Sequence, residues 1–461
     1  MRTSAYRTCT RLVALALLLA AVPATARAAD TASSARLTTR LALTAPAICG
    51  YGASVRATAT LRRYDDTPLS NRRVVISRVG DDPAVLADAT TDAAGRVSVT
   101  LAPVRKVSIQ ATFPGTRYLA PSLSATATTK PRAKLARPWT HSAYAYPGQR
   151  LPARGRIWPK HSSANDSTII YCDRWEDGRW VLREKYRAKI VNDGDKSSYD
   201  AVIKLPKAGT WRVRAKHRDG NHALTFSGAT KIKVVDWPGK YDDRRNFRFA
   251  SPEKMVAITI DDGPNGRTMD FCRVLEKYGG RGTFFWTGSR LRHGYREQAK
   301  RVYARGHEIA NHTDHHKTLT GSYSGCYSEV IVPKRLIRDY TGFSPMWVRA
   351  MGGSVGSTGV RAVNDSGQLY CNWSIDSYDA HGLSLSSGEV YDNVMRGVKP
   401  GSVILIHQTH SESLEALPRI CRELKRRGYE IVTLSDLAAR SEPYSRDGGP
   451  WYRRTTFRRV D

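Results

Sequence analysis

The chain has 461 residues, with 73 Lys and Arg against 42 Asp and Glu, for a formal net charge of +31. This length exceeds what one hydrophobic core usually serves, so we expect roughly three domains. The charge favours anionic surroundings, but zinc-finger, recognition-helix and RNP-like aromatic patterns are missing, which argues against a nucleic-acid partner. We interpret the charge as retention near an anionic cell wall; a generally basic, solvated surface explains it equally well.

The N-terminus has the pattern of a secretory signal peptide. Arginines precede the apolar run LVALALLLAAV, and ATARAAD offers a small-residue cleavage site after Ala28. The run is too short to favour a membrane-spanning helix, and no later stretch is long enough. We therefore expect residues 1–28 to be removed and the mature protein to be secreted, either extracellular or associated with the cell wall. An uncleaved membrane anchor is the alternative.

The cysteines point to an oxidising compartment. Seven occur, and Cys9 leaves with the signal peptide, so an even number remains. None of them forms a C-x-x-C pair, which argues against a thiolate zinc site. Disulfides are therefore expected, although the sequence does not determine their pairing.

Residues 35–130 are predicted to form an all-β sandwich. Short β-branched runs such as ASVRATATLRR, RRVVISRV and KVSIQATF are separated by turn sequences such as DDTPLSN and TDAAGR. The stretch TTDAAGRVSVTL, followed by ATFPGTRYLAPS, resembles bacterial immunoglobulin-like modules.

Residues 135–238 form a second β-rich segment, with runs such as STIIYCDRW, YDAVIKL and TWRVRAKH. We expect Trp175, Trp180 and Trp211 to be core or cross-strand residues, with a sugar-binding face as the alternative. Neither β-rich segment has an evident cluster of titratable groups. We therefore predict that both have a supporting or wall-targeting role, without chemistry of their own.

The pattern changes over residues 245–440, where apolar runs alternate with helical stretches. Runs such as MVAITI, GTFFWTG and GSVILIH alternate with helical sequences such as RTMDFCRVLEKYG and LPRICRELKRRG. This alternation predicts an α/β domain with a largely parallel sheet or barrel. Residues 441–461 form a basic, aromatic tail. The predicted fold class is thus multidomain, with all-β modules preceding an α/β catalytic domain.

Polar residues follow the predicted strands, where such folds place their sites. Asp261 and Asp262 end the run MVAITI, and adjacent like charges need a reason such as a bound cation. His312 and His316 in NHTDHHKTL are spaced i, i+4 and would share a face of a helical turn. Asp262 would complete a site with three protein ligands and an open position, which is typical of catalytic zinc. His315 should point elsewhere.

Five motifs carry a resemblance to a known family. TIDDGP, HTDHH, WVRAMGG, DSYDA and VILIHQ occur in the order and approximate spacing found in the polysaccharide deacetylases, the NodB-homology domain of carbohydrate esterase family four. The resemblance covers roughly residues 250 to 440 and implies a distorted (β/α) barrel. It also implies a hydrolase that cleaves amide bonds and binds one zinc or other divalent ion per chain.

The resemblance implies a role for each matched residue. Asp261 would be the general base, while Asp262, His312 and His316 hold the metal.

His407 matches the general acid, and Asp379 matches the carboxylate that orients it. Asp376 is an alternative for that orienting role, or it caps a turn. Arg349 matches the arginine that positions the base. The backbone N–H of Gly352, at the usual tyrosine position, would help to bind the oxyanion.

The third and fourth motifs depart from the family pattern. RAMG replaces the usual R-P-P-Y, and Ala380 replaces the tryptophan that follows the second aspartate in D-x-x-D-W. We expect a secreted N-deacetylase that acts on acetylated amino-sugars of peptidoglycan or of chitin-like polymers. One alternative is an O-acetyl esterase on acetylated polysaccharide; the other is a catalytically impaired wall-binding protein.

Overall fold

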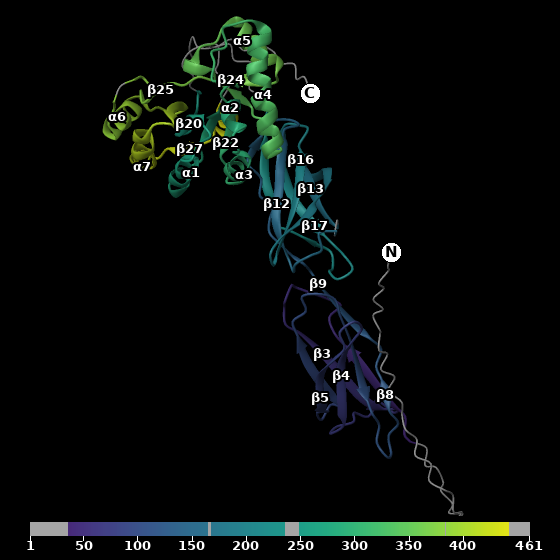
Figure 1. Ribbon diagram of the computed structural model, residues 1–461. Helices are drawn as coiled ribbons and strands as arrows, with labels where there is room; N and C mark the ends of the chain where they lie inside the picture. The colour runs from purple at the N-terminus through teal and green to yellow at the C-terminus, as the bar shows by residue number, and fades with distance from the viewer. Residues whose placement is uncertain (1–35, 165–166, 236–248, 383, 442–461) are drawn as a thin grey trace, which may run out of the picture. The chain divides into compact units, whose positions relative to one another are not determined.

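The computed structural model describes residues 36–164, 167–235, 249–382 and 384–441. The predicted signal peptide and all but the first residue of the predicted tail lie outside these residues. The elements described before residue 250 are all strands, whereas those after it are strands and helices (Figure 1). None of the helices in the described ranges is long and apolar enough to cross a membrane.

The first β-rich segment contains a three-stranded sheet in the order β1-β3-β6 and a second sheet in the order β2-β9-β7-β4-β5, with β8 paired to β7. Buried residues alternate along β3, where Ala57, Ala59 and Leu61 face the core, as expected for a half-buried strand. The strands are β1 (Thr39–Thr44), β2 (Ile48–Cys49), β3 (Val55–Arg63), β4 (Arg73–Val79), β5 (Ala84–Thr90), β6 (Arg96–Leu101), β7 (Val107–Phe113), β8 (Ser122–Leu123) and β9 (Ala127–Pro131). An immunoglobulin-like topology stays a prediction.

The second β-rich segment has two sheets that share one hydrophobic core. Their orders are β10-β12-β16-β15 and β11-β19-β17-β13-β14, with β18 paired to β17. Trp211 is buried in this core, and Trp175 faces Trp180 across β13 and β14, as predicted. The strands are β10 (Lys134–Leu135), β11 (Tyr144–Ala145), β12 (Arg150–Trp158), β13 (Thr168–Glu176), β14 (Arg179–Arg187), β15 (Lys189–Asp193), β16 (Lys196–Lys204), β17 (Gly209–His217), β18 (Thr225–Phe226) and β19 (Thr230–Val234).

The C-terminal segment is built on a parallel sheet in the order β24-β23-β22-β21-β20-β26-β25, with β27 also paired to β20. Among the described strands, β24 and β25 are the two ends of this sheet, so it is a curled, open sheet and the predicted barrel is only partial. The strands are β20 (Met255–Gly263), β21 (Thr283–Trp286), β22 (Glu308–Asn311), β23 (Trp347–Val348), β24 (Leu369–Tyr370), β25 (Ile375–Asp376), β26 (Ser402–His407) and β27 (Glu430–Val432).

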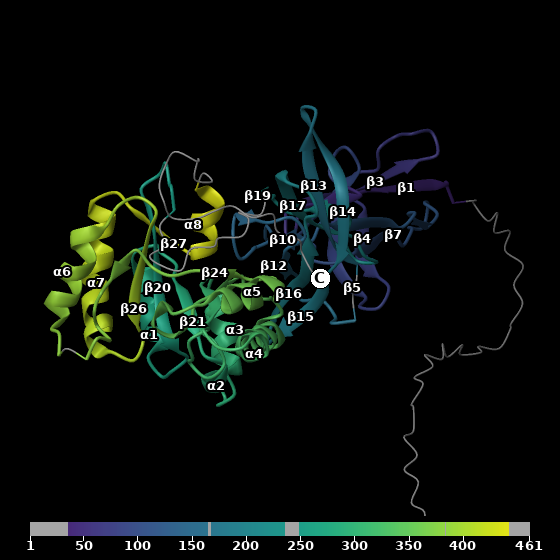
Figure 2. The same ribbon diagram turned by 90° about the horizontal axis from the view of Figure 1, so that it is seen from above.

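Helices cover this sheet through amphipathic faces. In α7, Leu417, Ile420, Cys421 and Leu424 recur at helical spacing and pack into the main core. Helices α6 and α7 lie side by side along one flank of the sheet (Figures 1 and 2). The helices are α1 (Thr268–Lys277), α2 (Gly288–Leu291), α3 (Arg296–Ala304), α4 (Tyr323–Thr341), the 3-10 turn η1 (Met351–Gly353), α5 (Ser357–Asp365), α6 (Ser387–Gly397), α7 (Ser411–Arg426) and α8 (Leu434–Arg440).

The disulfides that the sequence predicted are absent from the part of the chain that the structure describes, which corrects that prediction. Every cysteine in the described ranges is a buried free thiol: Cys49, Cys172, Cys272, Cys326, Cys371 and Cys421. Each serves as a small apolar residue within its own part of the core. Burial raises the pKa of the Cys272 and Cys421 thiols to about 12, so neither ionises readily.

Candidate active site

The predicted site residues gather at the carboxyl edge of the parallel sheet. Asp261 and Asp262 lie near the end of β20, and His407 is the last residue of the neighbouring strand β26. The register of the two strands places Asp261 opposite His407. His312 follows the last residue of β22, and Arg349 follows the last residue of β23. Since parallel strands all end at the same edge, four strand ends supply one site.

The backbone of β20 changes at the paired aspartates. Asp262 has a φ of +65°, in the left-handed region, and the pairing of β20 with β21 is irregular between Ile260 and Gly263. In a regular strand, successive side chains point to opposite faces. The left-handed residue interrupts this alternation and lets both carboxylates approach His312. Such backbone strain costs about 1–3 kcal/mol and often accompanies function.

Asp261 is paired with a buried arginine. Nη1 of Arg349 donates to Oδ1 of Asp261 over 2.7 Å, and both side chains are almost fully buried. The guanidinium is held in place by the carbonyl oxygens of Cys371 and Asn372 and by the ring of Phe285, whose centroid lies 4.1 Å away. A buried charge pair with these additional partners keeps the Asp261 carboxylate in one orientation.

The predicted metal ligands converge. Nε2 of His312 and Nε2 of His316 lie 3.4 and 3.1 Å from Oδ1 of Asp262. Nδ1 of His312 lies 2.9 Å from the carbonyl oxygen of Arg349, so it carries the proton and turns Nε2 toward the carboxylates. Metal-binding histidines are commonly oriented in this way.

These residues fit a divalent cation. Oδ1 of Asp262 is buried and has no hydrogen-bond partner among the described residues. Burial would raise the pKa of Asp262, but His312 and His316 outweigh it and hold the pKa well below its usual range. Burial would likewise lower the pKa of His312, but Asp261 and Asp262 outweigh it and raise that pKa. An unpartnered carboxylate oxygen facing two imidazole nitrogens is a site for a cation.

The two histidines lie on a loop and not on the helical turn that their spacing suggested. The loop follows β22, and its backbone is left-handed at Thr313, with a φ of +64°, and at His316, with a φ of +54°. These two residues turn the chain so that the rings of His312 and His316 lie 4.8 Å apart. His315 points away, as predicted, and its Nδ1 lies 2.9 Å from a carboxylate oxygen of Glu329.

His407 and Asp379 form a second couple at the same edge. Nδ1 of His407 lies 2.6 Å from Oδ1 of Asp379, and the hydroxyl of Ser413 donates to Oδ2 of Asp379. Burial lowers the pKa of His407, but the hydrogen bond and charge of Asp379 outweigh burial and raise the pKa to about 9. Burial raises the pKa of Asp379, but His407 outweighs burial and lowers it. His407 is thus held in its protonated form at neutral pH.

The alternative carboxylate, Asp376, has other partners. Its Oδ1 accepts the backbone N–H of Tyr378 over 2.7 Å, and its Oδ2 accepts from Trp373 Nε1 and lies 3.2 Å from His381 Nε2. Asp376 therefore caps a turn, and Asp379 is the carboxylate that contacts His407.

Gly352 is the middle residue of η1 and lies three residues after Arg349 in the third motif. It is exposed and has a φ of +58°, a conformation that suits glycine better than the tyrosine usual in the family. Met351 beside it is 39% exposed. The participation of the Gly352 N–H in oxyanion binding stays a prediction.

Two residues of this network escaped the sequence analysis. Ser413 lies in the first turn of α7 and reaches Asp379. Thr259 accepts from Arg349 Nη1 over 2.9 Å and donates to the carbonyl oxygen of Ile404. Thr259 is the first residue of the TIDDGP motif, so the motif could have indicated it as a site residue. Ser413 lies outside the five motifs, and no sequence pattern near it indicated a role.

Replacing Ser413 by alanine should lower deacetylase activity about tenfold with no change in metal content. The hydrogen bond from the hydroxyl to a buried carboxylate contributes about 1.5–3 kcal/mol. Without it, Asp379 should orient His407 less well, which raises the barrier to reaction by part of that amount. The deacetylase rates of Ser413→Ala and of the control variant Ser411→Ala, two residues earlier on α7, test this prediction. A variant with full activity would mean that Ser413 does not help to orient the couple.

Comparisons with known proteins find relatives of the C-terminal segment. The polysaccharide deacetylase family model matches residues 249–370. A peptidoglycan-N-acetylglucosamine deacetylase of Bacillus cereus is 32% identical over 194 residues, or 40% of this chain and 71% of the relative. The peptidoglycan-N-acetylmuramic acid deacetylase PdaC of Bacillus subtilis is 31% identical over 40% of this chain and 39% of its own length. The solved structure of PdaC has 30% identity over 40% of this chain and 90% of that chain, with a TM-score of 0.38.

A curled parallel sheet with an Asp/His/His cluster, a second carboxylate and a His–Asp couple at one edge defines a hydrolase that can work with a metal ion. The chain belongs to the polysaccharide deacetylase family, whose members hydrolyse amide bonds.

Proposed function

We propose that the chain is a secreted, metal-dependent N-deacetylase that removes acetyl groups from N-acetylated amino-sugars of peptidoglycan. The observation that carries the proposal is the meeting of three arrangements at one sheet edge. These are the Asp262–His312–His316 cluster, the Asp261–Arg349 pair and the His407–Asp379 couple.

Asp261 is the proposed general base. A divalent ion held by Asp262, His312 and His316 would lower the pKa of a bound water and polarise the acetyl carbonyl. Arg349 occupies Oδ1 of Asp261, so Oδ2, which lies 3.5 Å from His312 Nε2, is left to take a proton from the attacking water. The paired aspartates therefore divide the work between metal binding and proton transfer.

His407 is the proposed general acid. Its Nδ1 is engaged by Asp379, so Nε2 is the nitrogen that gives a proton to the departing amine. An amine leaves poorly without a proton, and this makes the couple important for amide cleavage. The Gly352 N–H is proposed to stabilise the oxyanion.

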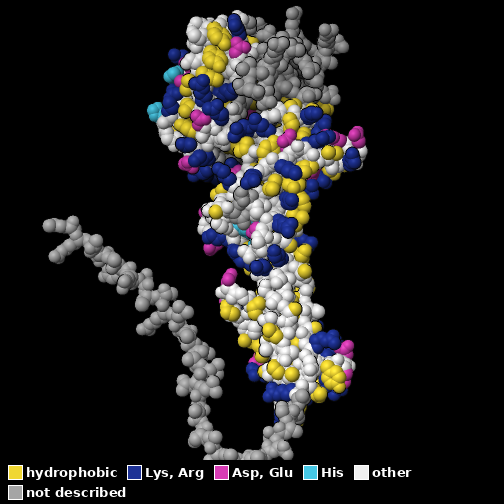
Figure 3. Space-filling model, turned by 90° about the vertical axis from the view of Figure 1, so that its right-hand side faces the viewer, with side chains coloured by type: hydrophobic (Ala, Val, Ile, Leu, Met, Phe, Trp, Pro, Cys, Tyr) yellow, Lys and Arg dark blue, Asp and Glu magenta, His cyan; other side chains and the backbone are white. Residues whose placement is uncertain are grey.

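Peptidoglycan is the favoured polymer for two reasons. Both relatives described above are named as peptidoglycan deacetylases. The net charge of +31 suits an anionic wall. Lys and Arg side chains are spread over the face seen in Figure 3, with Asp and Glu among them, which fits general attraction to the wall more than one anion-binding patch.

An acetate-release assay on the metal-loaded protein tests the proposal. Peptidoglycan, chitin oligomers and acetylxylan are compared, and free amine is measured beside acetate. Equal release of amine and acetate from peptidoglycan supports the N-deacetylase. Acetate without amine from acetylxylan would favour the O-acetyl esterase, and no release from any polymer would favour the impaired wall-binding protein.

Activity should fall at alkaline pH as His407 loses its proton. Its pKa is raised to about 9, so the acid form is present at neutral pH and is lost as the pH rises through that value. A bound cation beside Asp262 lowers the pKa of His407, which makes about 9 the upper limit for the alkaline limb. Asp379→Asn should move this limb to lower pH, since Asp379 supplies the largest stabilisation of the protonated form.

The matched control is Asp376→Asn, whose limb should stay where it is in the wild type because Asp376 caps a turn. Profiles of kcat/KM against pH for the three proteins decide the matter. If the alkaline limb of the Asp379→Asn profile stayed at the pH found for the wild type, a group other than the His407–Asp379 couple would be responsible for it.

A further inference from the structure

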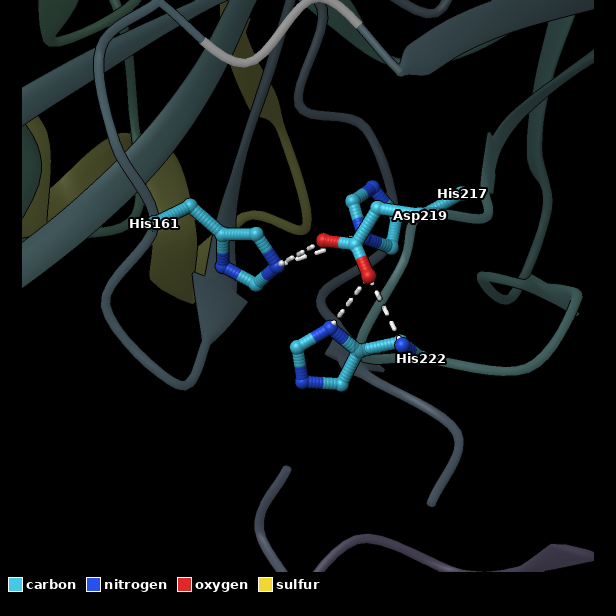
Figure 4. Close-up of side chains that lie close together, drawn as sticks. All are labelled: His161, His217, Asp219 and His222. Atoms are coloured by element: carbon cyan, nitrogen blue, oxygen red, sulfur yellow. Dashed lines mark hydrogen bonds and ion pairs between the residues drawn. The ribbon is translucent and has the colours of Figure 1, made fainter. Parts of the chain in front are cut away.

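The second β-rich segment contains a cluster that the sequence analysis overlooked. His161, His217, Asp219 and His222 bring four side chains together, each with one metal-binding atom, and these atoms all lie within 4.8 Å of one another. Figure 4 shows the three imidazoles arranged around the carboxylate. The prediction that this segment lacks clustered titratable groups is therefore wrong. The prediction failed because His161 is far in the sequence from the other three residues, which lie at the end of β17 and in the turn after it.

We propose that this cluster is a second metal site, which binds zinc with three imidazole nitrogens and one carboxylate oxygen. The proposal does not depend on the deacetylase function, because no residue of the cluster belongs to the candidate active site.

The spacing of the side chains suits a tetrahedral ion. Nε2 of His161 and Nε2 of His217 lie 3.2 Å apart, and they lie 3.4 and 3.3 Å from Oδ2 of Asp219. Metal–ligand bonds of about 2.0–2.1 Å place the ligand atoms of a tetrahedron about 3.3–3.4 Å apart. The three atoms therefore form one face of such a tetrahedron. Nδ1 of His222, 2.9 Å from the other oxygen of Asp219, supplies the fourth ligand.

The partners of the outer nitrogens determine which inward nitrogen lacks a proton when each ring is neutral. Nδ1 of His161 lies 2.5 Å from the carbonyl oxygen of Pro159, and Nε2 of His222 lies 3.1 Å from that of Val104, which belongs to the same compact unit. A carbonyl oxygen only accepts, so each of these outer nitrogens carries the proton. In the neutral rings, Nε2 of His161 and Nδ1 of His222 then present lone pairs to the carboxylate of Asp219.

When all three rings are neutral, hydrogen bonds within the cluster do not remove the repulsion between the ring lone pairs and the carboxylate of Asp219. Nδ1 of His217 lies 2.9 Å from the hydroxyl of Thr168, which can donate to it, so Nε2 of His217 can carry one inward proton. That single proton leaves the lone pair of His222 facing Oδ1 of Asp219. A cation in the centre is attracted by all four groups, and outer N–H bonds to carbonyl oxygens are typical of metal-binding histidines.

The carboxylate is held in place for this role. Oδ1 of Asp219 accepts the backbone N–H groups of Asn221 and His222 over 2.8 and 2.7 Å, which fixes the turn after β17. The turn directs Oδ2 toward His161 and His217. The three histidines are at most 5% exposed. A closed site with four protein ligands and little access to water is typical of structural zinc and not of catalysis.

The bound ion would connect the two sheets of the sandwich. His161 lies in the loop after β12, which belongs to one sheet, whereas His217 ends β17 of the other sheet. The described cysteines of this protein form no disulfide, so no disulfide joins these two sheets within the described residues. A bound metal ion would provide a cross-link between them.

Zinc counting on the full-length protein tests the site. The protein is stripped with a chelator, reloaded with zinc alone and freed of excess metal, and the zinc per chain is measured. The background is His316→Ala, which weakens the active-site cluster. Adding His222→Gln to this background should remove one zinc per chain. Adding Asp173→Asn should remove none, because Asp173 is a buried carboxylate of the same sandwich that pairs with Arg212 and Arg214 and lies outside the cluster.

A spectroscopic measurement covers the case in which the His222 variant folds poorly. The His316→Ala protein loaded with cobalt should show the intense visible absorption of tetrahedral Co²⁺. Absence of zinc and of this absorption in His316→Ala itself would overturn the proposal, whatever the double variant does. Equal zinc in the proteins with and without His222→Gln would overturn it as well.

Discussion

Asp261→Asn and Asp262→Asn should have different consequences although the residues are neighbours and the chemical change is the same. Asp261→Asn is expected to lower amide hydrolysis about a hundred- to ten-thousand-fold, the usual contribution of a general base, and to keep the wild-type metal content. Asp262→Asn is expected to lose both activity and one metal ion per chain. The reason is geometry: Asp261 is held by Arg349, whereas Oδ1 of Asp262 faces His312 and His316.

Metal analysis and kcat/KM on the same preparations measure both effects, and each variant serves as the control for the other. Circular dichroism spectra should match that of the wild type, because neither substitution changes side-chain volume appreciably. Loss of the ion from Asp261→Asn, or its full retention in Asp262→Asn, would reverse the assignment of the two carboxylates.

His407→Gln should damage amide cleavage far more than ester cleavage. Removing a general acid costs about a hundred- to ten-thousand-fold where the leaving group needs a proton. The amine of an amino-sugar needs one, whereas the phenolate of an activated aryl acetate leaves without it. We therefore expect the aryl acetate rate to fall by less than about tenfold, since the base and the metal cluster remain in place.

The matched control is His410→Gln, three residues after His407 in the chain, whose ring centroid lies 6.1 Å from that of His407. The contacts that Asp379 makes with described residues are with His407 and Ser413. Its amide and ester rates should both stay near those of the wild type. Equal, small losses on the two substrates in His407→Gln would mean that His407 is structural only.

Several features of the fold follow from short-range patterns in the sequence. The alternation of apolar and polar residues in β3, and the helical spacing of apolar residues in α7, predict the elements that the structure contains. The order of strands and helices after residue 250 predicts a parallel sheet, because such strands need crossover connections. The expected barrel is open, since its closure depends on pairing between strands that lie far apart in the chain.

The cysteine prediction shows where composition misleads. An even number of cysteines in an exported chain favours disulfides, but a disulfide also needs two Cα atoms within about 7 Å and suitably directed side chains. Cys172 lies in the second sandwich and Cys371 in the core of the α/β segment, as buried apolar residues. Only packing decides which thiols meet.

The sequence by itself determined the family and singled out the candidate site residues, because Asp261, Asp262, His312 and His316 occur in short motifs whose residue types suit metal binding and proton transfer. Only the tertiary structure decided how each carboxylate is held, since that depends on a left-handed residue in β20 and on the buried contact of Asp261 with Arg349, which is remote in the chain. Likewise, HRDGNH at residues 217–222 carries no clear meaning until the fold brings His161 beside it. Spacing along the chain predicts local geometry, whereas a site assembled from distant loops exists only once the sheets have packed.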